Sequence, residues 1–340
     1  MSQVADVAQK LKKKDFVSDQ DVRWCPGCGD YAILAQVQKV FPELGIPKED
    51  FLVVSGIGCS SRFPYYMSTY GFHSIHGRAP AIASGAKLAN PNLSVWMVTG
   101  DGDAMSIGGN HLIHILRRNM DIKILMFNNK IYGLTKGQYS PTSELGKVTK
   151  STPMGSLDYP FNPSSLALGA GATFVARTMD RETKHLAETI SLANEHKGAT
   201  FLDIYQNCNI FNDGAHSNYT DRELKNDTQL KLKHNEPMVF GVGGSKILKL
   251  EGSNFKVLEL EKGYSLDDAV VHDYNDKNLA FLLSEITMNE NLPTPFGIIY
   301  KEDKPTYDDM MKKQMDLAKD KGGSVDLQKI VSGSNTWEVS

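Results

Sequence analysis

Short apolar runs alternate with stretches of helical spacing over the first two-thirds of the chain. Runs with the length of buried strands lie at residues 51–55, 95–98, 122–127, 173–177 and 200–205. Apolar positions spaced as on a helix face lie between or beside them, at residues 31–41, 81–88, 107–118, 164–168 and 181–196. Alternation of this kind builds a parallel sheet with helices on both faces. The pattern therefore predicts an α/β fold with a doubly wound, mostly parallel sheet.

The pattern weakens after Tyr219, where the chain becomes more charged. Short strands are predicted at residues 238–241 and 255–258, and helices at residues 279–286 and 308–319. We therefore expect three parts: a polar N-terminal arm (1–22), the main α/β domain (23–219) and a small α+β extension (220–340). The extension carries no motif that indicates a function.

Composition excludes several classes of protein. Of 340 residues, 41% are hydrophobic and 23% charged, and the net charge of −3 does not suit a basic nucleic-acid binder or a disordered chain. No apolar run approaches membrane-spanning length, and the N-terminus lacks the apolar core of a signal peptide. Four cysteines in this length are not a secreted disulfide framework, so we expect a cytoplasmic protein.

The most informative stretch runs from residue 95 to residue 132. Gly100 to Asp103 are expected to turn the chain after one strand, and the helix that follows has Ile107, His111, His114 and Ile115 on one face. The next strand ends in Asn128 and Asn129. Ligands bind at the carboxyl ends of parallel strands, so Asp101 and Asn129 are expected to lie close together. Their oxygens suit Mg²⁺ shared with phosphates, although Gly, Asp and Asn are also ordinary turn residues.

The four cysteines lie in predicted loops. Cys25 and Cys28 form a CxxC pair, and Cys59 and Cys208 each follow a predicted strand. Structural zinc, a thioredoxin-like pair, four unrelated thiols and a [4Fe–4S] cluster all compete as interpretations. Spacing alone leaves zinc and the cluster open.

Several motifs resemble one enzyme family. GDG followed at this distance by NN is similar to the signature of proteins that bind thiamine diphosphate (TPP). The string NNKIYGLTKGQYSPTS, together with WCPGCGD, GIGCSS and the surroundings of Cys208, resembles the β subunits of the 2-oxoacid:ferredoxin oxidoreductases, in particular the 2-oxoglutarate branch. The resemblance covers about residues 21–214.

The resemblance implies two cofactor sites. Asp101, Asn129 and the carbonyl of Ile131 are expected to bind Mg²⁺, and Cys25, Cys28, Cys59 and Cys208 to hold a [4Fe–4S] cluster. The residues expected to border TPP are Ile57, Gly58, Cys59, Ser60, His76, Gly77, Arg78, Ala79, Gly102, Asp103, Gly133 and Leu134.

Two further side chains are candidates for contact with substrate. The guanidinium of Arg62 suits a carboxylate, which every 2-oxo acid has, although an interface ion pair explains an arginine equally well. His76 suits proton transfer or a hydrogen bond to an intermediate, or is simply a core hydrogen-bonding partner. Lys136 is a weaker candidate, and His111 and His114 are expected to be packed.

The resemblance implies oxidative decarboxylation of 2-oxoglutarate to succinyl-CoA and CO₂, with electrons passing through the cluster to ferredoxin. Coenzyme A and a 2-oxo acid are then the small-molecule substrates. The Glu that activates TPP lies on a separate pyrimidine-binding domain, which this family carries on an α subunit, so the chain alone is expected to be inactive. Alternatives are a β subunit for pyruvate or branched-chain 2-oxo acids, a non-redox TPP decarboxylase with structural zinc, and a non-catalytic electron-transfer or scaffold subunit that keeps the fold but not the cofactor.

Overall fold

The computed structural model of the chain describes residues 11–322 and 326–339. The first ten residues of the expected N-terminal arm lie outside the described residues, and the rest of it contains a 3-10 turn whose Phe16 is buried. Within the described part, no helix is long and apolar enough to cross a membrane.

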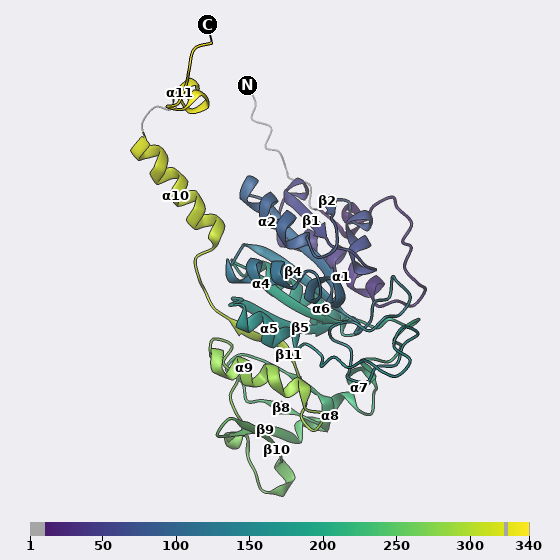
Figure 1. Cartoon of the computed structure of the whole chain (residues 1–340). Helices are drawn as coiled ribbons and strands as arrows, with labels where there is room; N and C mark the ends of the chain where they lie inside the picture. The colour runs from purple at the N-terminus through teal and green to yellow at the C-terminus, as the bar shows by residue number, and fades with distance from the viewer. Residues whose placement is uncertain (1–10, 323–325, 340) are drawn as a thin grey trace, which may run out of the picture.

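One eight-stranded sheet forms the centre of the molecule (Figure 1). Its strand order is β2-β1-β3-β4-β6-β5-β11-β7, and every neighbouring pair is parallel except β5 with β11. The strands are β1 (Phe51–Ser55), β2 (Tyr70–His73), β3 (Ser94–Gly100), β4 (Ile122–Asn128), β5 (Phe174–Met179), β6 (Thr200–Tyr205), β7 (Gln229–Lys231) and β11 (Thr294–Lys301). The predicted doubly wound α/β fold is confirmed.

Helices cover both faces of this sheet, which is why its central strands are apolar at nearly every position. Along β1 and β3, alternate side chains enter two separate cores: Val54 and Met97 belong to one, Val53 and Trp96 to the other. The helices over the first core are α2 (Ala79–Ala89), α4 (Gly109–Arg117), α5 (Pro163–Gly169) and α9 (Lys277–Glu285). Those over the second are α1 (Asp30–Val40) and α6 (Thr183–Glu195).

The segment after β3 differs from its prediction. The GDGD sequence is not a turn but starts a short helix, α3 (Asp101–Met105), and α4 begins only at Gly109. Ser106, with ψ −110°, breaks the helical path between them, so the apolar face must be counted anew from Gly109. Leu112, Ile115 and Leu116 form the buried face of α4. Of the expected face, Ile115 is buried and His111 and His114 are partly buried, whereas Ile107 lies before the helix and is 57% exposed.

The last third contributes to the main sheet and to a second, smaller one. Strands β7 and β11 join the large sheet, and β8 (Val239–Phe240), β9 (Lys246–Glu251) and β10 (Asn254–Glu259) form an antiparallel sheet of three. The remaining helices are α7 (Ser217–Thr220), α8 (Lys225–Thr228), α10 (Tyr307–Gly322) and α11 (Leu327–Ser332). The 3-10 helices are η1 (Lys13–Phe16), η2 (Phe41–Leu44), η3 (Lys48–Asp50), η4 (Ser60–Tyr66), η5 (Val242–Gly244), η6 (Leu260–Lys262), η7 (Leu266–Asp268) and η8 (Ile286–Met288). A domain boundary at residue 220 stays a prediction.

Candidate functional site

The strand order brings four loops together at one edge of the large sheet. Strands β1, β3, β4 and β6 are consecutive and parallel, so their carboxyl ends lie side by side. The loops that leave these ends carry Cys59, Asp101, Asn129 and Cys208. Residues far apart in the sequence therefore meet at this edge, as parallel topology requires.

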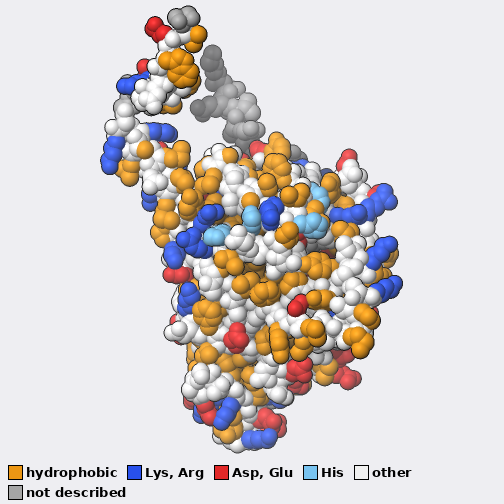
Figure 2. All heavy atoms as spheres, viewed as in Figure 1, with side chains coloured by type: hydrophobic (Ala, Val, Ile, Leu, Met, Phe, Trp, Pro, Cys, Tyr) orange, Lys and Arg blue, Asp and Glu red, His pale blue; other side chains and the backbone are white. Residues whose placement is uncertain are grey.

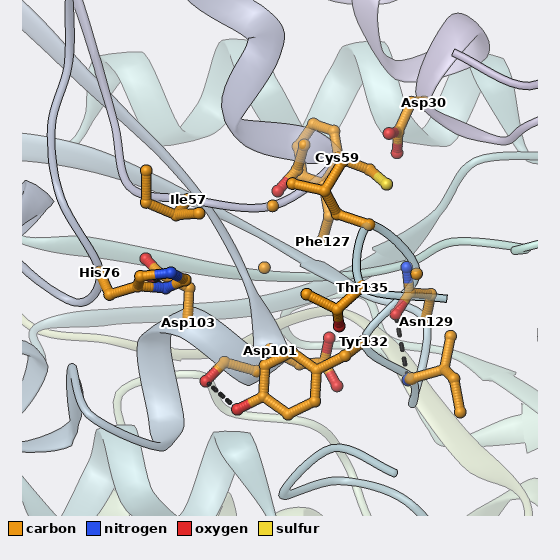
Figure 3. Close-up of a pocket in the computed structure, with 17 residues that line it drawn as sticks. Asp30, Ile57, Cys59, His76, Asp101, Asp103, Phe127, Asn129, Tyr132 and Thr135 are labelled. Atoms are coloured by element: carbon orange, nitrogen blue, oxygen red, sulfur yellow. Dashed lines mark hydrogen bonds and ion pairs between the residues drawn. The ribbon is translucent and has the colours of Figure 1, made fainter. Parts of the chain in front are cut away.

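A cavity of about 60 Å³ lies between the first three of these loops (Figure 3). Asp101, Asn129 and Ile131, the three predicted Mg²⁺ ligands, all line it. The full lining is Asp30, Ile57, Gly58, Cys59, Ser60, His76, Gly100, Asp101, Gly102, Asp103, Phe127, Asn129, Ile131, Tyr132, Gly133, Leu134 and Thr135. Of the residues expected to border TPP, Gly77, Arg78 and Ala79 do not line this cavity.

Asp101 is held by two hydroxyl groups from the long loop that follows β4. Its Oδ2 accepts hydrogen bonds from Ser140 Oγ at 2.5 Å and from Thr142 Oγ1 at 2.6 Å. Burial raises the pKa of Asp101 to about 6, although the two hydroxyls oppose the shift. These hydroxyls could not be recognised from the sequence beyond a Ser- and Thr-rich loop, because only the fold brings that loop back over β3.

Asp103 has a structural role that explains the positions of residues 76–79. Its Oδ1 accepts a hydrogen bond from the backbone N–H of Gly77 at 2.9 Å, and its Oδ2 accepts one from Thr99 Oγ1 at 3.2 Å. His76 Nδ1 lies 3.6 Å from the same Oδ1. Arg78 turns away, with Nη1 3.3 Å from the carbonyl oxygen of Ile107. Asp103 thus anchors the loop so that, of its first residues, only His76 reaches the cavity.

Tyr132 closes the cavity above Gly102. Its hydroxyl donates to the Gly102 carbonyl at 3.0 Å, and its ring occupies the space that a Cβ at position 102 would need. The side-chain oxygen of Asn129 accepts from the Ile131 N–H at 3.1 Å, which leaves one lone pair for a cation. Pockets that bury a whole small-molecule ligand measure roughly 300–1,000 Å³. The cavity alone therefore accommodates only part of a cofactor of the size of TPP.

A second cavity, of about 290 Å³, is lined by all four cysteines. Hydrogen bonds tie the CxxC loop to the loop after β6: Asn209 Nδ2 donates to the Pro26 carbonyl at 2.7 Å, and Gln206 Nε2 donates to Cys28 Sγ at 3.2 Å. Trp24 Nε1 donates to the Cys59 carbonyl at 2.7 Å and ties the third loop to the first. The predicted convergence of Cys25, Cys28, Cys59 and Cys208 on one space is thus observed.

The thiols surround this space rather than a single point. A Cβ placed on Gly133 would lie 3.5 Å from the sulfurs of both Cys59 and Cys208. In residues 11–322 and 326–339, no three His, Cys, Asp or Glu side chains are arranged to hold one metal ion. Burial, reinforced by Asp30, raises the pKa of Cys28 above its ordinary value and that of Cys59 to about 12.

The two cavities share one wall. Asp30, Cys59, Asn129, Gly133 and Leu134 line both of them. Asp30 is 1% exposed, burial raises its pKa to about 7, and its Oδ2 has no hydrogen-bond partner among the described residues. Asp30 was not predicted as a site residue, although its place directly after the CxxCG motif pointed to this loop.

The remaining candidates lie around the second cavity or outside both. Arg62 and Lys136 line the cavity of the cysteines and not the cavity of Asp101, and Arg62 Nη1 is 3.5 Å from the Arg23 carbonyl. His111 and His114 lie on α4, partly buried, and line neither cavity. A substrate contact by Arg62 stays a prediction.

Models of two protein families match separate parts of the chain. Residues 56–204 match the family described as "Thiamine pyrophosphate enzyme, C-terminal TPP binding domain". Residues 260–316 match the family of the C-terminal part of the pyruvate ferredoxin oxidoreductase β chain. The second match falls in the last third, where no motif could be recognised from the sequence.

One curated relative and one solved structure match the chain over nearly its whole length, and another relative matches about half of it. The 2-oxoglutarate oxidoreductase subunit KorB of Mycobacterium tuberculosis is 54% identical over 97% of this chain and 89% of its own length. The 2-oxoglutarate synthase subunit KorB of Methanothermobacter marburgensis is 44% identical over 54% of this chain and 65% of its own length. Among solved structures, a 2-oxoglutarate:ferredoxin oxidoreductase from Magnetococcus marinus, with 2-oxoglutarate, coenzyme A and succinyl-CoA bound, matches with a TM-score of 0.77 and 34% identity. That match covers 96% of this chain and 97% of the other.

Proposed function

This chain belongs to the family of β subunits of the 2-oxoacid:ferredoxin oxidoreductases, and from that premise we propose what its two cavities do. The cavity of Asp101 holds the diphosphate and Mg²⁺ of TPP, and the cavity of the cysteines holds a [4Fe–4S] cluster. The complete enzyme converts 2-oxoglutarate, coenzyme A and two oxidised ferredoxins to succinyl-CoA, CO₂ and two reduced ferredoxins, with release of one proton.

The observation that carries the proposal is the wall shared by the two cavities. When bound, TPP supplies the electron sink that lets a 2-oxo acid lose CO₂. Oxidation of the remaining fragment releases two electrons, and an iron–sulfur cluster accepts them one at a time. Cys59 and Gly133 line both cavities, so a cluster held by the cysteines would be close to the part of the cofactor that the first cavity holds.

The residues of the first cavity fit a diphosphate with its cation. Asp101, the side chain of Asn129 and the carbonyl of Ile131 supply three oxygens of the kind that Mg²⁺ prefers, and phosphate oxygens and water complete such a shell. Gly58, Gly102 and Gly133 leave backbone N–H groups open to phosphate. The other cofactor contacts proposed are Ile57, Cys59, Ser60, His76, Asp103 and Leu134. Gly77 to Ala79 do not line the cavity, so they would hold the residues that contact the cofactor rather than contact it themselves.

The residues of the second cavity fit a cluster better than zinc. Four thiols line a space of about 290 Å³, and Gly133 lacks the side chain that would enter it between Cys59 and Cys208. An anaerobic preparation is expected to be brown, with a broad absorption band towards the violet. A colourless preparation that contains zinc would instead favour a non-redox TPP decarboxylase.

The favoured substrate is 2-oxoglutarate, because relatives that match the chain bear that name. Arg62 lies at the cavity of the cysteines, next to the shared wall, where its guanidinium suits the second carboxylate of this acid. His76 is 64% exposed in its side chain and reaches the first cavity, so it is free to bond a reacting oxygen. Pyruvate and branched-chain 2-oxo acids are the alternative substrates.

The site needs a partner, an α subunit, for its remaining walls. The cavity of about 60 Å³ is too small for the whole cofactor, so the pyrimidine ring needs walls from another chain. Figure 2 shows hydrophobic side chains among charged ones over the face covered by α2, α4 and α5. In the loop after β4, Met154, Leu157 and Tyr159 are 94%, 88% and 82% exposed, as at surfaces that bind another protein.

Turnover of the reconstituted complex tests the proposal. With TPP, Mg²⁺, coenzyme A and a viologen acceptor, 2-oxoglutarate is expected to react faster than pyruvate or a branched-chain 2-oxo acid, and the isolated chain is expected to show no turnover. A faster reaction with pyruvate would contradict the substrate. Robust turnover by the isolated chain would contradict the shared site.

A further inference from the structure

A chain of buried polar side chains runs from Asp101 into the middle of the sheet. The hydroxyl of Thr142 lies 2.6 Å from Asp101 Oδ2 and 3.1 Å from Asn128 Oδ1. Asn128 Nδ2 donates to Asp203 Oδ1 at 3.0 Å, and Arg177 Nε donates to Asp203 Oδ2 at 3.1 Å. Every contact is thus at hydrogen-bond distance.

The series of hydrogen-bonded side chains that starts at Asp101 ends in the last third of the protein. Arg177 Nη2 donates to Ser164 Oγ at 2.9 Å, and Nη1 lies 3.4 Å from the carbonyl oxygen of Pro295 on β11. Asn128, Asp203, Arg177 and Pro295 lie on β4, β6, β5 and β11, which are neighbours in the sheet, so the contacts cross four strands. A segment outside the cofactor loops is in this way connected to Asp101.

The ion pair at its centre is fully buried. Arg177 and Asp203 each have 0% exposure and stand opposite each other in the paired strands β5 and β6. Removing two charges from water is so unfavourable that such a pair contributes little net stability compared with apolar side chains of the same size. A purely structural need in an apolar core is met more simply by packing, which suggests a second role.

The pair determines which way the amide of Asn128 faces. A carboxylate only accepts hydrogen bonds, so the NH₂ of Asn128 must face Asp203 and its Oδ1 must face Thr142. The Thr142 hydroxyl has one proton and is placed between two acceptors, Asn128 Oδ1 and Asp101 Oδ2. The charge on Asp203 therefore determines that Thr142 meets an acceptor on its Asn128 side, so that Asn128 Oδ1 and Asp101 Oδ2 share the one proton of this hydroxyl.

We propose that the Arg177–Asp203 pair, through Asn128 and Thr142, positions the Asp101 carboxylate for the cation that holds the cofactor diphosphate. The inference rests on the proposed function, because it takes Asp101 as a ligand of that cation. Arg177, Asp203, Asn128 and Thr142 are positioning residues and do not touch the cofactor. Loss of the partners that orient a metal ligand typically weakens metal affinity about 10- to 100-fold.

A purely structural pair predicts a different result. If the pair only joins β5, β6 and β11, its replacement by apolar side chains changes thermal stability and leaves cation affinity alone. If it positions Asp101, the same replacement weakens cation binding while the protein stays folded. Metal affinity and melting temperature, measured on the same variants, separate these two roles.

The test uses the full chain in complex with its partner subunit, with Mn²⁺ in place of Mg²⁺ and TPP present. Free Mn²⁺ is counted by electron paramagnetic resonance, and calorimetry without ligand gives the melting temperature. The double variant Arg177→Met with Asp203→Leu removes the pair without leaving an unpaired charge. Thr142→Val interrupts the series of hydrogen bonds without changing the pair. It therefore tests the connection to Asp101 even if the double variant does not fold. Asp101→Ala removes the ligand itself, and Lys123→Met disturbs a buried ion pair at the other end of the sheet.

Both the double variant and Thr142→Val are expected to bind Mn²⁺ about 10-fold more weakly or worse, and their combination to be less than additive because they act through one path. Lys123→Met is expected to lower the melting temperature without changing Mn²⁺ affinity. An affinity within twofold of wild type in the folded double variant, or in Thr142→Val, with Asp101→Ala still abolishing binding, would overturn the positioning role and leave the proposed function intact. Retention of tight Mn²⁺ binding by Asp101→Ala would overturn the proposed cation site and the positioning role with it.

Discussion

The two ends of the large sheet both bury charged groups but balance them differently. At the amino end, Asp121 lies between two lysines, 2.7 Å from Lys123 Nζ and 3.3 Å from Lys87 Nζ. Burial alone would raise the pKa of Asp121, but the lysines hold it below its ordinary value. At the carboxyl end, burial raises the pKa values of Asp30, Asp101 and Asp103, because no lysine or arginine of the described residues pairs with them.

Cavity size does not distinguish the two ends. The cleft at the amino end measures about 480 Å³ and is larger than either cavity at the carboxyl end. Its buried charges are satisfied by one another and by backbone carbonyls: Lys87 Nζ also donates to Pro91 and Leu93, and Lys123 Nζ to His196. Unbalanced carboxylates and thiols, rather than volume, distinguish the end at which we propose that the cofactors bind. We therefore expect mutations at the carboxyl end to change cofactor binding and mutations at the amino end to change stability.

The largest effect is expected from Asp101→Ala. It should weaken TPP and Mg²⁺ binding by at least about 100-fold, since loss of a ligand exceeds the 10- to 100-fold effect of losing a ligand's partner. Because an isolated buried carboxylate is unfavourable, the ligand-free protein should keep its stability or gain some. Titration calorimetry with TPP and Mg²⁺, together with thermal melting of the free protein, measures both. Undiminished affinity would show that the cation binds elsewhere, and Asp101→Asn is the matched control for volume.

Gly133→Val should remove most of the iron. A side chain at this position enters the space between the sulfurs of Cys59 and Cys208, each 3.5 Å from the added Cβ. Iron and sulfide content per chain and the absorption spectrum give the result, and Gly133→Ala should show a smaller loss. A full complement of iron in the valine variant would argue that the cluster does not lie between these cysteines.

At the amino end, Asp121→Ala should act on stability and not on cofactors. It leaves Lys87 and Lys123 buried without a counter-ion, which destabilises by roughly 3 kcal/mol as for other broken buried pairs. Urea unfolding of the ligand-free chain measures the change, and TPP affinity should stay within twofold of wild type. A loss of TPP affinity with unchanged stability would reverse the comparison between the two ends.

The smallest effect concerns pH. Burial, assisted by Lys123, lowers the pKa of His196 from 6.5 to about 4. Below pH 6.5 the unfolded chain binds a proton at this histidine, whereas the folded protein does not, so protonation favours unfolding. The stability of the folded protein is therefore unaffected by this group above pH 6.5 and falls progressively as the pH is lowered towards 4. The urea midpoint should therefore decline between pH 7 and pH 5, and His196→Gln should show a shallower decline. Equal slopes for the two proteins would rule out His196 as the titrating group.

The central strands were predictable because burial on both faces makes them uniformly apolar. Strands β1 and β6 end where the apolar runs end. Strand β2 was missed because its four residues, YGFH, are all exposed at the edge of the sheet. Strand β11 was missed because Pro295 and Gly297 interrupt its pattern. The strand tolerates both residues: Pro295 has no backbone N–H to contribute to the sheet, and Gly297 takes φ +114° where β11 meets β5.

The site was predictable as far as motifs reached. Asp101, Asn129 and the four cysteines were each next to a strand end, where the topology brings side chains together. Ser140, Thr142 and Tyr132 were not predicted as site residues, because a loop without secondary structure gives no sign of where it folds back. The Arg177–Asp203 pair was missed for another reason: both residues interrupt apolar strands, and only the pairing of β5 with β6 sets them opposite each other.

The hydrogen bond from Asn209 to the Pro26 carbonyl joins positions 183 residues apart. At translation rates of about 5–20 residues per second, the CxxC loop is synthesised on the order of 10–40 s before Cys208. During that interval only three of the four thiols proposed to hold the cluster are present. Insertion of the proposed cluster would therefore have to follow synthesis of the loop after β6, and a chain that ends before this loop would lack the fourth thiol.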